Sequence, residues 1–248
     1  MSILEVAASA KIEAEDFLHV EQIRLLAHWL EGRDIPKTKE VCELMSSAWK
    51  ALPDHTYPQG KLYRGMRLGL TSIKALMLGK SINNEEPRHA CESWSTDEVE
   101  ATGFAKTRIK MGTSLVMSRK PDNIIINMAD LLSVGWGVGA SSGWSRRIKD
   151  MEHMIGYQKE VLVRPLRKIK PANMHMALLP VFTVYDKKSD KLRKWLVGIL
   201  PKNKLDVTKD LTRRGSNRPL YRIALLVDNG RVTKVGRISY MGNKPQWL

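Results

Sequence analysis

The stretch GYQKEVLVRP, residues 156–165, reads as a turn that leads into a strand opened by the carboxylate of Glu160. Side chains in extended chain repeat with a period of two, so Gln158 and Glu160 are expected on the same side of the backbone. A Gln-x-Glu pair is most often a solvated strand edge. Its meaning therefore depends on the residues that precede it.

Length and composition predict a soluble cytoplasmic protein. A chain of 248 residues can bury a sizeable core without disulfides or structural metals. Its two cysteines, Cys42 and Cys91, match no zinc or disulfide spacing and are interpreted as buried thiols of a reducing compartment. The first residues lack a basic, apolar leader, and no apolar run approaches the length of a membrane span.

The net charge of +15 lies almost wholly in the C-terminal third of the chain. Residues 165–248 hold 19 Lys and Arg against 5 Asp and Glu, which is +14, and residues 1–164 hold 22 against 21. One reading is a solvated surface that keeps the protein in solution. The other is a surface that faces a polyanion, most simply nucleic acid.

Apolar spacing and cap signals predict helices and strands alternating along the first part of the chain. Thr96 is expected to cap one of these helices. The expected helices are 13–31, one that follows Pro36, 72–78, 97–106 and 129–133, and the expected strands are 61–66, 91–95, 114–118 and 123–127.

The pattern of apolar and polar residues after Pro165 predicts β structure with turns. Strands 179–185 and 192–200 are expected to flank a turn at 187–190, and strands 221–227 and 231–238 to flank Asp228-Asn229-Gly230, because an Asn-Gly step is a strong hairpin signal. A polar linker is expected at 206–219, with loop at 213–218.

The glycine-rich segment 135–143 is expected to be a flexible loop or flap and not a phosphate cradle. It lacks the Gly-Lys-Ser/Thr ending of a P-loop. It also lacks the strand, helix and downstream acidic residue of a dinucleotide fingerprint.

Three short motifs stand in a definite order. Arg64 ends a strand in Tyr-Arg-Gly, Ser93 and Ser95 form a Ser-x-Ser, and Glu160 follows in Gln-x-Glu, with 29 and then 67 residues from the Arg to the Ser to the Glu. This order resembles the R-S-E class of ADP-ribosyltransferases, which includes Rho-modifying clostridial exoenzymes, binary actin-modifying toxins and enzymes of T-even phages. Phe104, 11 residues after Ser93, stands where that family often has a nicotinamide-contacting aromatic.

The resemblance implies NAD+ as co-substrate, without a metal, and assigns roles to the motif residues. Glu160 would stabilise the ribosyl cation and hold the ribose 2′-hydroxyl. Arg64 would bind the phosphates, and the backbone of Gly65 would approach the nicotinamide amide. Ser93 would orient Glu160 and Ser95 would support the strand end. Phe104 would stack on the nicotinamide; its alternative role is core packing.

The resemblance also bears on the acceptor. In the family, a Glu two residues before the catalytic Glu goes with arginine acceptors, and a Gln goes with asparagine, glutamine or guanine bases. Gln158 can donate and accept at once, which suits an amide or a base edge, and Tyr157 would stack on a splayed base or pack on a side chain. Together with the basic C-terminal third, this favours RNA or DNA as acceptor.

The expected function is therefore mono-ADP-ribosylation of a nucleic-acid base by a bacterial toxin, phage-defence or phage protein, with an antitoxin or chaperone as a possible partner and no membrane association. Three alternatives stay open: modification of a host protein, an inactive nucleic-acid-binding protein, and an NAD+ glycohydrolase.

The expected fold is α+β, an ADP-ribosyltransferase-like split mixed sheet. It is divided into a helical lead-in (1–55), a catalytic core (56–185) and a basic β-hairpin extension (186–248).

Overall fold

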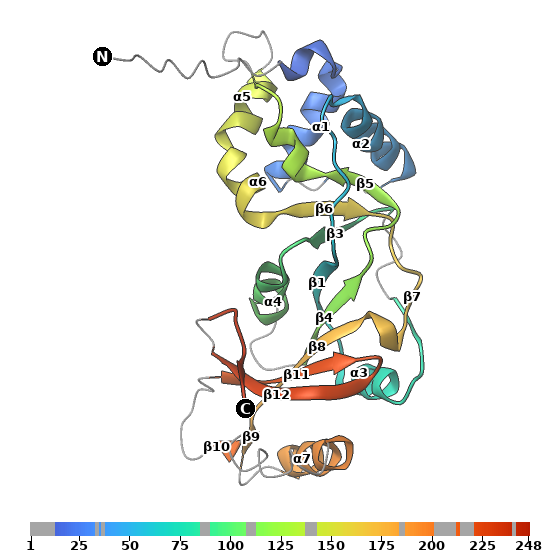
Figure 1. The fold of residues 1–248 in the computed structure, drawn as a ribbon, viewed down its shortest axis with the longest axis vertical. Coiled ribbons are helices and arrows are strands. Elements are labelled where there is room, and N and C mark those ends of the chain that lie inside the picture. Colours follow the sequence, from blue (N-terminus) through green and yellow to red (C-terminus); the bar gives the residue numbers. More distant parts are fainter. Residues whose placement is uncertain are drawn as a thin grey trace, which may run out of the picture. The chain divides into compact units, whose positions relative to one another are not determined.

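The computed structural model describes residues 13–32, 35, 38–84, 90–107, 113–136, 143–183, 187–200, 212–213, 221–239 and 242–248. They form an α+β fold with several helices and a large antiparallel sheet (Figure 1). The predicted α+β class is confirmed at this level. Residues 137–142 of the flap predicted at 135–143 and most of the linker predicted at 206–219 lie outside the described residues.

The chain forms two compact units, and each is described by itself. The first unit comprises residues 1–59, 88–93 and 121–165, and the second comprises residues 60–87, 94–120 and 166–248. These units do not follow the predicted division at residues 56 and 186. The helical lead-in belongs with residues 121–165, and the C-terminal hairpin belongs with the middle of the chain.

Helices pack on a strand pair in the first unit. Strands β5 (Ile124–Asn127) and β6 (Glu160–Val163) pair antiparallel, and α2 packs on β5 while α1 packs on α2 and α5. The helical elements are η1 (Ala14–Asp16), α1 (Val20–Leu30), α2 (Lys39–Ala51), η2 (Met128–Leu132), α5 (Gly143–Asp150) and α6 (Glu152–Gln158).

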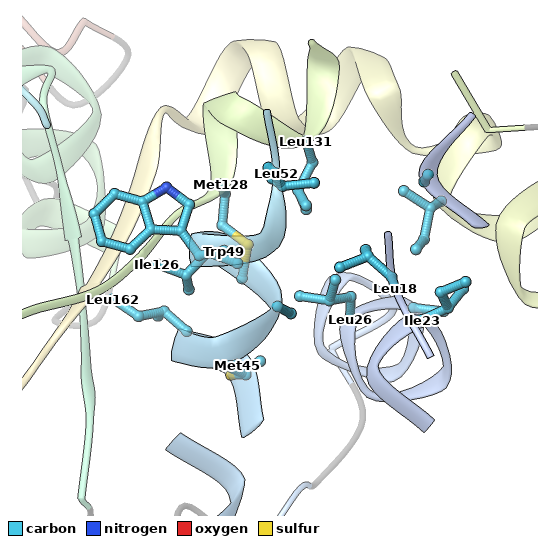
Figure 2. Packing of buried hydrophobic residues seen from close by; sticks show 14 of the residues in the cluster. Leu18, Ile23, Leu26, Met45, Trp49, Leu52, Ile126, Met128, Leu131 and Leu162 are labelled. Carbon is cyan, nitrogen blue, oxygen red and sulfur yellow. The ribbon is translucent and has the colours of Figure 1, made fainter. Parts of the chain in front are cut away.

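The core of the first unit follows from the apolar spacing of these helices. Trp49 and Met45 of α2 are buried in one cluster with Ile126 of β5, and Leu26 lies on the buried face of α1 (Figure 2). Cys42 and Cys91 are buried thiols that form no disulfide, as predicted. The helix expected from residue 13 is shorter, because α1 begins at Val20 after the 3₁₀ turn η1, and α5 and α6 were not predicted.

The second unit is built on an antiparallel sheet with neighbours in the order β13-β12-β11-β8-β4-β1-β3. Its bounds are β1 (Leu62–Arg67), β3 (Glu92–Ser95), which begins in the first unit, β4 (Ser114–Arg119), β8 (Met174–Leu179), β11 (Tyr221–Asp228), β12 (Arg231–Ser239) and β13 (Gln246–Trp247). The strands predicted near β1, β3 and β4 are confirmed. The predicted strand 179–185 is confirmed only in part, because β8 ends at Leu179 and the strand β9 within that range comprises Phe182–Thr183.

The remaining elements of the second unit are α3 (Leu70–Met77), α4 (Glu98–Thr107), α7 (Lys187–Ile199), η3 (Pro171–Asn173) and the short pairs β2 (Ile82–Asn83) with β7 (Lys168–Ile169) and β9 (Phe182–Thr183) with β10 (Thr212–Arg213).

The prediction of a strand at 192–200 after a turn at 187–190 is wrong. Both segments belong to α7, whose buried Leu192 and Leu196 lie one helical turn apart. Arg213, predicted to be loop, lies in β10.

The predicted C-terminal hairpin is confirmed. Asn229 and Gly230 both have positive φ, 47° and 80°, which is the conformation that a two-residue type I′ turn requires. Asp228 and Arg231 pair directly across the turn, and β11 pairs on its other side with β8. The hairpin is therefore part of the main sheet of its unit.

Candidate active site

Glu160, the predicted catalytic carboxylate, is the first residue of β6 and is half-buried. The segment before it is not extended as predicted. Gln158 is the last residue of α6, and Lys159 has a left-handed conformation (φ 48°) that ends the helix. The prediction that Gln158 and Glu160 share one side of the backbone assumed an extended chain at these residues. That assumption is wrong, because Gln158 is helical.

Trp29 of α1 contacts the Glu160 carboxylate within the first unit. Its indole Nε1 donates a hydrogen bond to Oε2 of Glu160 at 3.3 Å. The two residues lie 131 positions apart in the sequence, so spacing gives no signal for the contact. The neutral indole donor fixes the orientation of the carboxylate. The carboxylate can still accept further hydrogen bonds.

The two other first-unit residues of the predicted site are Ser93 and Tyr157. Ser93 is the second residue of β3 and is half-buried. Tyr157 lies in the last turn of α6 with 67 % of its surface exposed. The acceptor role predicted for Tyr157 stays a prediction.

Arg64 and Gly65 lie in the middle of β1 in the second unit, opposite Met117 and Val116 of β4. Arg64 is half-buried. Gly65 has a packing reason to be glycine, because a Cβ there would lie 2.1 Å from the carbonyl oxygen of Ala101 in α4. Its predicted contact with nicotinamide stays a prediction.

Ser95 and Phe104 also belong to the second unit. The Ser95 hydroxyl accepts a hydrogen bond from the backbone amide of Asp97 at 3.0 Å, and Asp97 in turn accepts one from Val99. Asp97, and not the predicted Thr96, therefore caps α4. Phe104 is 44 % exposed on α4, which excludes the alternative role of a core residue.

A group of three titratable side chains in the second unit was not predicted. His175 Nε2 lies 3.0 Å from Glu98 Oε1, without the alignment of a hydrogen bond. The ring of Tyr63 meets that of His175 edge-on, with centroids 5.0 Å apart. Interaction with His175 lowers the pKa of Glu98 more than burial raises it, and burial, followed by the charge of Glu98, raises the pKa of Tyr63.

A β-bulge explains how His175 reaches this group. Val116 pairs with Met176 and Met117 with Met174, so His175 has no opposite residue on β4. A bulge of this kind turns a side chain toward a face that strict alternation would not give it. Sequence alternation could not have indicated this position.

Asp130 of the first unit is a buried carboxylate whose role is structural. Its Oδ2 accepts hydrogen bonds from Trp49 Nε1 (2.5 Å) and the Thr56 amide (2.8 Å). Its Oδ1 accepts from the Thr56 hydroxyl (2.7 Å) and from Asn127 Nδ2 (3.2 Å). Since both oxygens are already occupied by protein donors, Asp130 ties the loop after α2 to η2.

The predicted site residues thus fall into two sets. Ser93, Tyr157, Gln158 and Glu160 belong to the first unit, and Arg64, Gly65, Ser95 and Phe104 belong to the second. Within the described parts of the chain, no three His, Cys, Asp or Glu side chains are grouped to hold a metal. No helix among the described residues has the length and apolarity needed to cross a bilayer.

A comparison with known proteins found no family model and no curated protein that matches this chain.

Proposed function

We propose that the chain is an NAD+-dependent mono-ADP-ribosyltransferase that transfers ADP-ribose to a base of RNA or DNA. The observation that supports it best is the Glu160 carboxylate, half-buried at the start of β6 and oriented by the indole of Trp29. The order of Arg64, Ser93 and Glu160 along the chain is the second support.

The proposed reaction breaks the bond between nicotinamide and the ribose C1′. The bonding pair leaves with nicotinamide, which departs as a neutral molecule, and the ribose carries a developing positive charge. Glu160 would stabilise that charge electrostatically. A nitrogen or oxygen of the acceptor then bonds to C1′ and loses its proton to solvent.

The roles of the other residues follow from the resemblance alone. Arg64 would bind the NAD+ phosphates, and Gly65 and Phe104 would contact nicotinamide. Ser93 and Ser95 would support the carboxylate and the strand end, and Gln158 and Tyr157 would meet the acceptor. The exposure of Phe104 and Tyr157 suits aromatic rings that contact a ligand.

The charge of the molecule supports nucleic acid as the acceptor. Residues of the second unit include 29 Lys and Arg against 10 Asp and Glu, whereas the first unit holds 12 against 16. The same observation favours a second candidate function, in which the protein binds nucleic acid without consuming NAD+.

Incubation with NAD+ labelled in the adenylate, together with separate pools of RNA, DNA and cell protein, tests the proposal. With the wild type, label is expected in a nucleic-acid pool. With the Glu160→Gln variant, this labelling is expected to be lost. Glu43→Gln is the matched control, since Glu43 is an exposed carboxylate of the same unit.

Label in protein alone would overturn the proposed acceptor. Nicotinamide release without label in any pool would indicate a glycohydrolase. The transferase is refuted if no pool is labelled and no nicotinamide is released.

A further inference from the structure

The net charge is divided unequally between the two units. From their residue ranges, the second unit carries +19 and the first carries −4. A charge of this size on one compact unit produces a positive potential that attracts polyanions and disfavours non-specific contact with other cationic surfaces.

Helix α7 of the second unit (Figure 1) carries lysines that are exposed to solvent. Lys187, Lys191 and Lys194 are exposed and stand at positions i, i+4 and i+7, which lie on one side of a helix. The opposite side carries Leu192 and Leu196, which are buried. The row spans about 10 Å at 1.5 Å per residue, so all three ammonium groups can contact neighbouring phosphates of one strand.

The surroundings add to this positive surface. Asp190 is within 3.0 Å of Arg193 and 2.9 Å of Lys194, but these pairs are exposed and therefore weak and screened by salt. The ammonium of Lys74 in α3 lies 4.9 Å from the centre of the Trp195 ring of α7. A fourth cation thus stands beside the row.

The composition of this face distinguishes between polyanions. A helix that lies on a membrane exposes a broad apolar side to the lipid, whereas the leucines of α7 are buried and Val197 is the large apolar side chain exposed among those described on it. Interfaces with proteins are poor in lysine. Lysine acts as a point charge toward phosphate, so a phosphodiester backbone fits this face best.

We propose that the Lys187–Lys191–Lys194 face of α7 binds the sugar–phosphate backbone of nucleic acid without regard to base sequence. This binding site is separate in the sequence from Glu160 and requires no NAD+. If the proposed transferase also holds, α7 retains the nucleic acid whose base is modified. If the transferase fails, the binding remains.

Fluorescence anisotropy of the full chain with a short labelled single-stranded RNA and a DNA duplex of the same length, without NAD+, tests the inference. Binding is measured at several KCl concentrations for the wild type and for the triple variant Lys187→Ala, Lys191→Ala, Lys194→Ala. Loss of three phosphate contacts is expected to reduce the slope of log K against log salt by about 2 to 3 and to weaken binding about 100-fold at about 0.1 M salt.

The matched control is Lys39→Ala, Lys50→Ala, Lys149→Ala, which removes three exposed lysines from the first unit. It is expected to retain the wild-type slope. A third variant, Lys187→Arg, Lys191→Arg, Lys194→Arg, keeps the charge and is expected to bind like the wild type, which separates loss of charge from loss of fold.

Two results would overturn the inference. One is a triple-alanine variant that binds RNA and DNA with the wild-type slope. The other is a wild type that binds neither nucleic acid but binds phosphatidylserine vesicles, because the face would then recognise a lipid surface.

Discussion

Glu160, the predicted catalytic residue, accepts a hydrogen bond from the side chain of Trp29. The indole donates to one carboxylate oxygen at 3.3 Å, from a helix that the chain leaves 130 residues before it reaches β6. If Glu160 stabilises a developing cation, its orientation matters as much as its charge. Trp29 is then a positioning residue, since it acts through the carboxylate.

We expect Trp29→Phe to lower the rate of nicotinamide release while it leaves KM for NAD+ nearly unchanged. A hydrogen bond to a carboxylate contributes up to about 1.5–3 kcal/mol, and at this length we expect about 1 kcal/mol, or about five-fold in kcat. Initial-rate kinetics provide the measurement. Trp144→Phe, at another half-buried tryptophan of the first unit, is the control, and equal rates for all three proteins would contradict the role.

We expect the Glu98–His175 pair to make the stability of the second unit sensitive to acid. Because His175 lowers the pKa of Glu98 in the fold, the carboxylate contributes stability that is fully present above its unfolded pKa and is lost as the pH falls through the lower folded value. We expect Glu98→Gln to unfold more readily at neutral pH and to lose less stability than the wild type between about pH 5 and pH 3.

Urea unfolding at a series of pH values measures this difference. Glu100→Gln, in the same helix, is the control and should follow the wild-type pH dependence. A Glu98→Gln variant with the wild-type slope of stability against pH would show that the pair contributes nothing.

The contact between β1 and α4 depends on one missing side chain. A Cβ on Gly65 would lie 2.1 Å from the Ala101 oxygen and 2.3 Å from the Ala105 amide nitrogen, and these backbone atoms cannot rotate away. The buried alanines of α4, Ala101 and Ala105, are the corresponding small residues on the helix. Glycine at this position is thus required by close packing of helix on strand.

We expect Gly65→Ala to destabilise the protein by about 3 kcal/mol, the upper end of the cost of overpacking, because α4 must move away from β1. Gly69→Ala is the matched control, since nothing lies within 4 Å of its added Cβ and its φ is −64°. Thermal unfolding measures both. If Gly65→Ala retains wild-type stability and loses only NAD+ cleavage, the glycine serves the ligand instead.

The arrangement of the whole chain makes the C-terminal quarter indispensable. The chain passes between the two units five times, at residues 59, 87, 93, 120 and 165. Residues 186–248 provide α7 and the β11–β12 hairpin, and β11 pairs directly with β8. They are therefore part of the second unit's core and not an appended module.

We expect deletion of residues 186–248 to prevent folding of the second unit. The deletion exposes the edge of β8 and removes the buried side chains of Ile223, Leu225 and Val235 from the core. Far-UV circular dichroism and urea unfolding of the 1–185 chain provide the measurement. Cooperative unfolding with a native-like spectrum would instead support the predicted separate extension.

Signals that act within a few residues predicted the structure well. The Asn229-Gly230 step placed a hairpin whose two positive φ values depend only on those residues. The apolar spacing of α2 likewise predicted a helix with one buried face. Local signals failed for α7, because a short apolar run beside polar residues fits either a strand or a helix until its packing is known.

The sequence by itself determined the elements whose pattern is local: the hairpin, the strands around Arg64 and Ser93, the buried thiols and the excess of positive charge in the C-terminal third. Tertiary structure alone decided that Trp29 reaches Glu160, that a bulge brings His175 to Glu98, that Gly65 lies under α4, and that the positive charge is concentrated in one unit. The three contacts join residues distant in sequence, and the charge of the second unit sums over segments distant in sequence. Only the folded backbone brings such residues together.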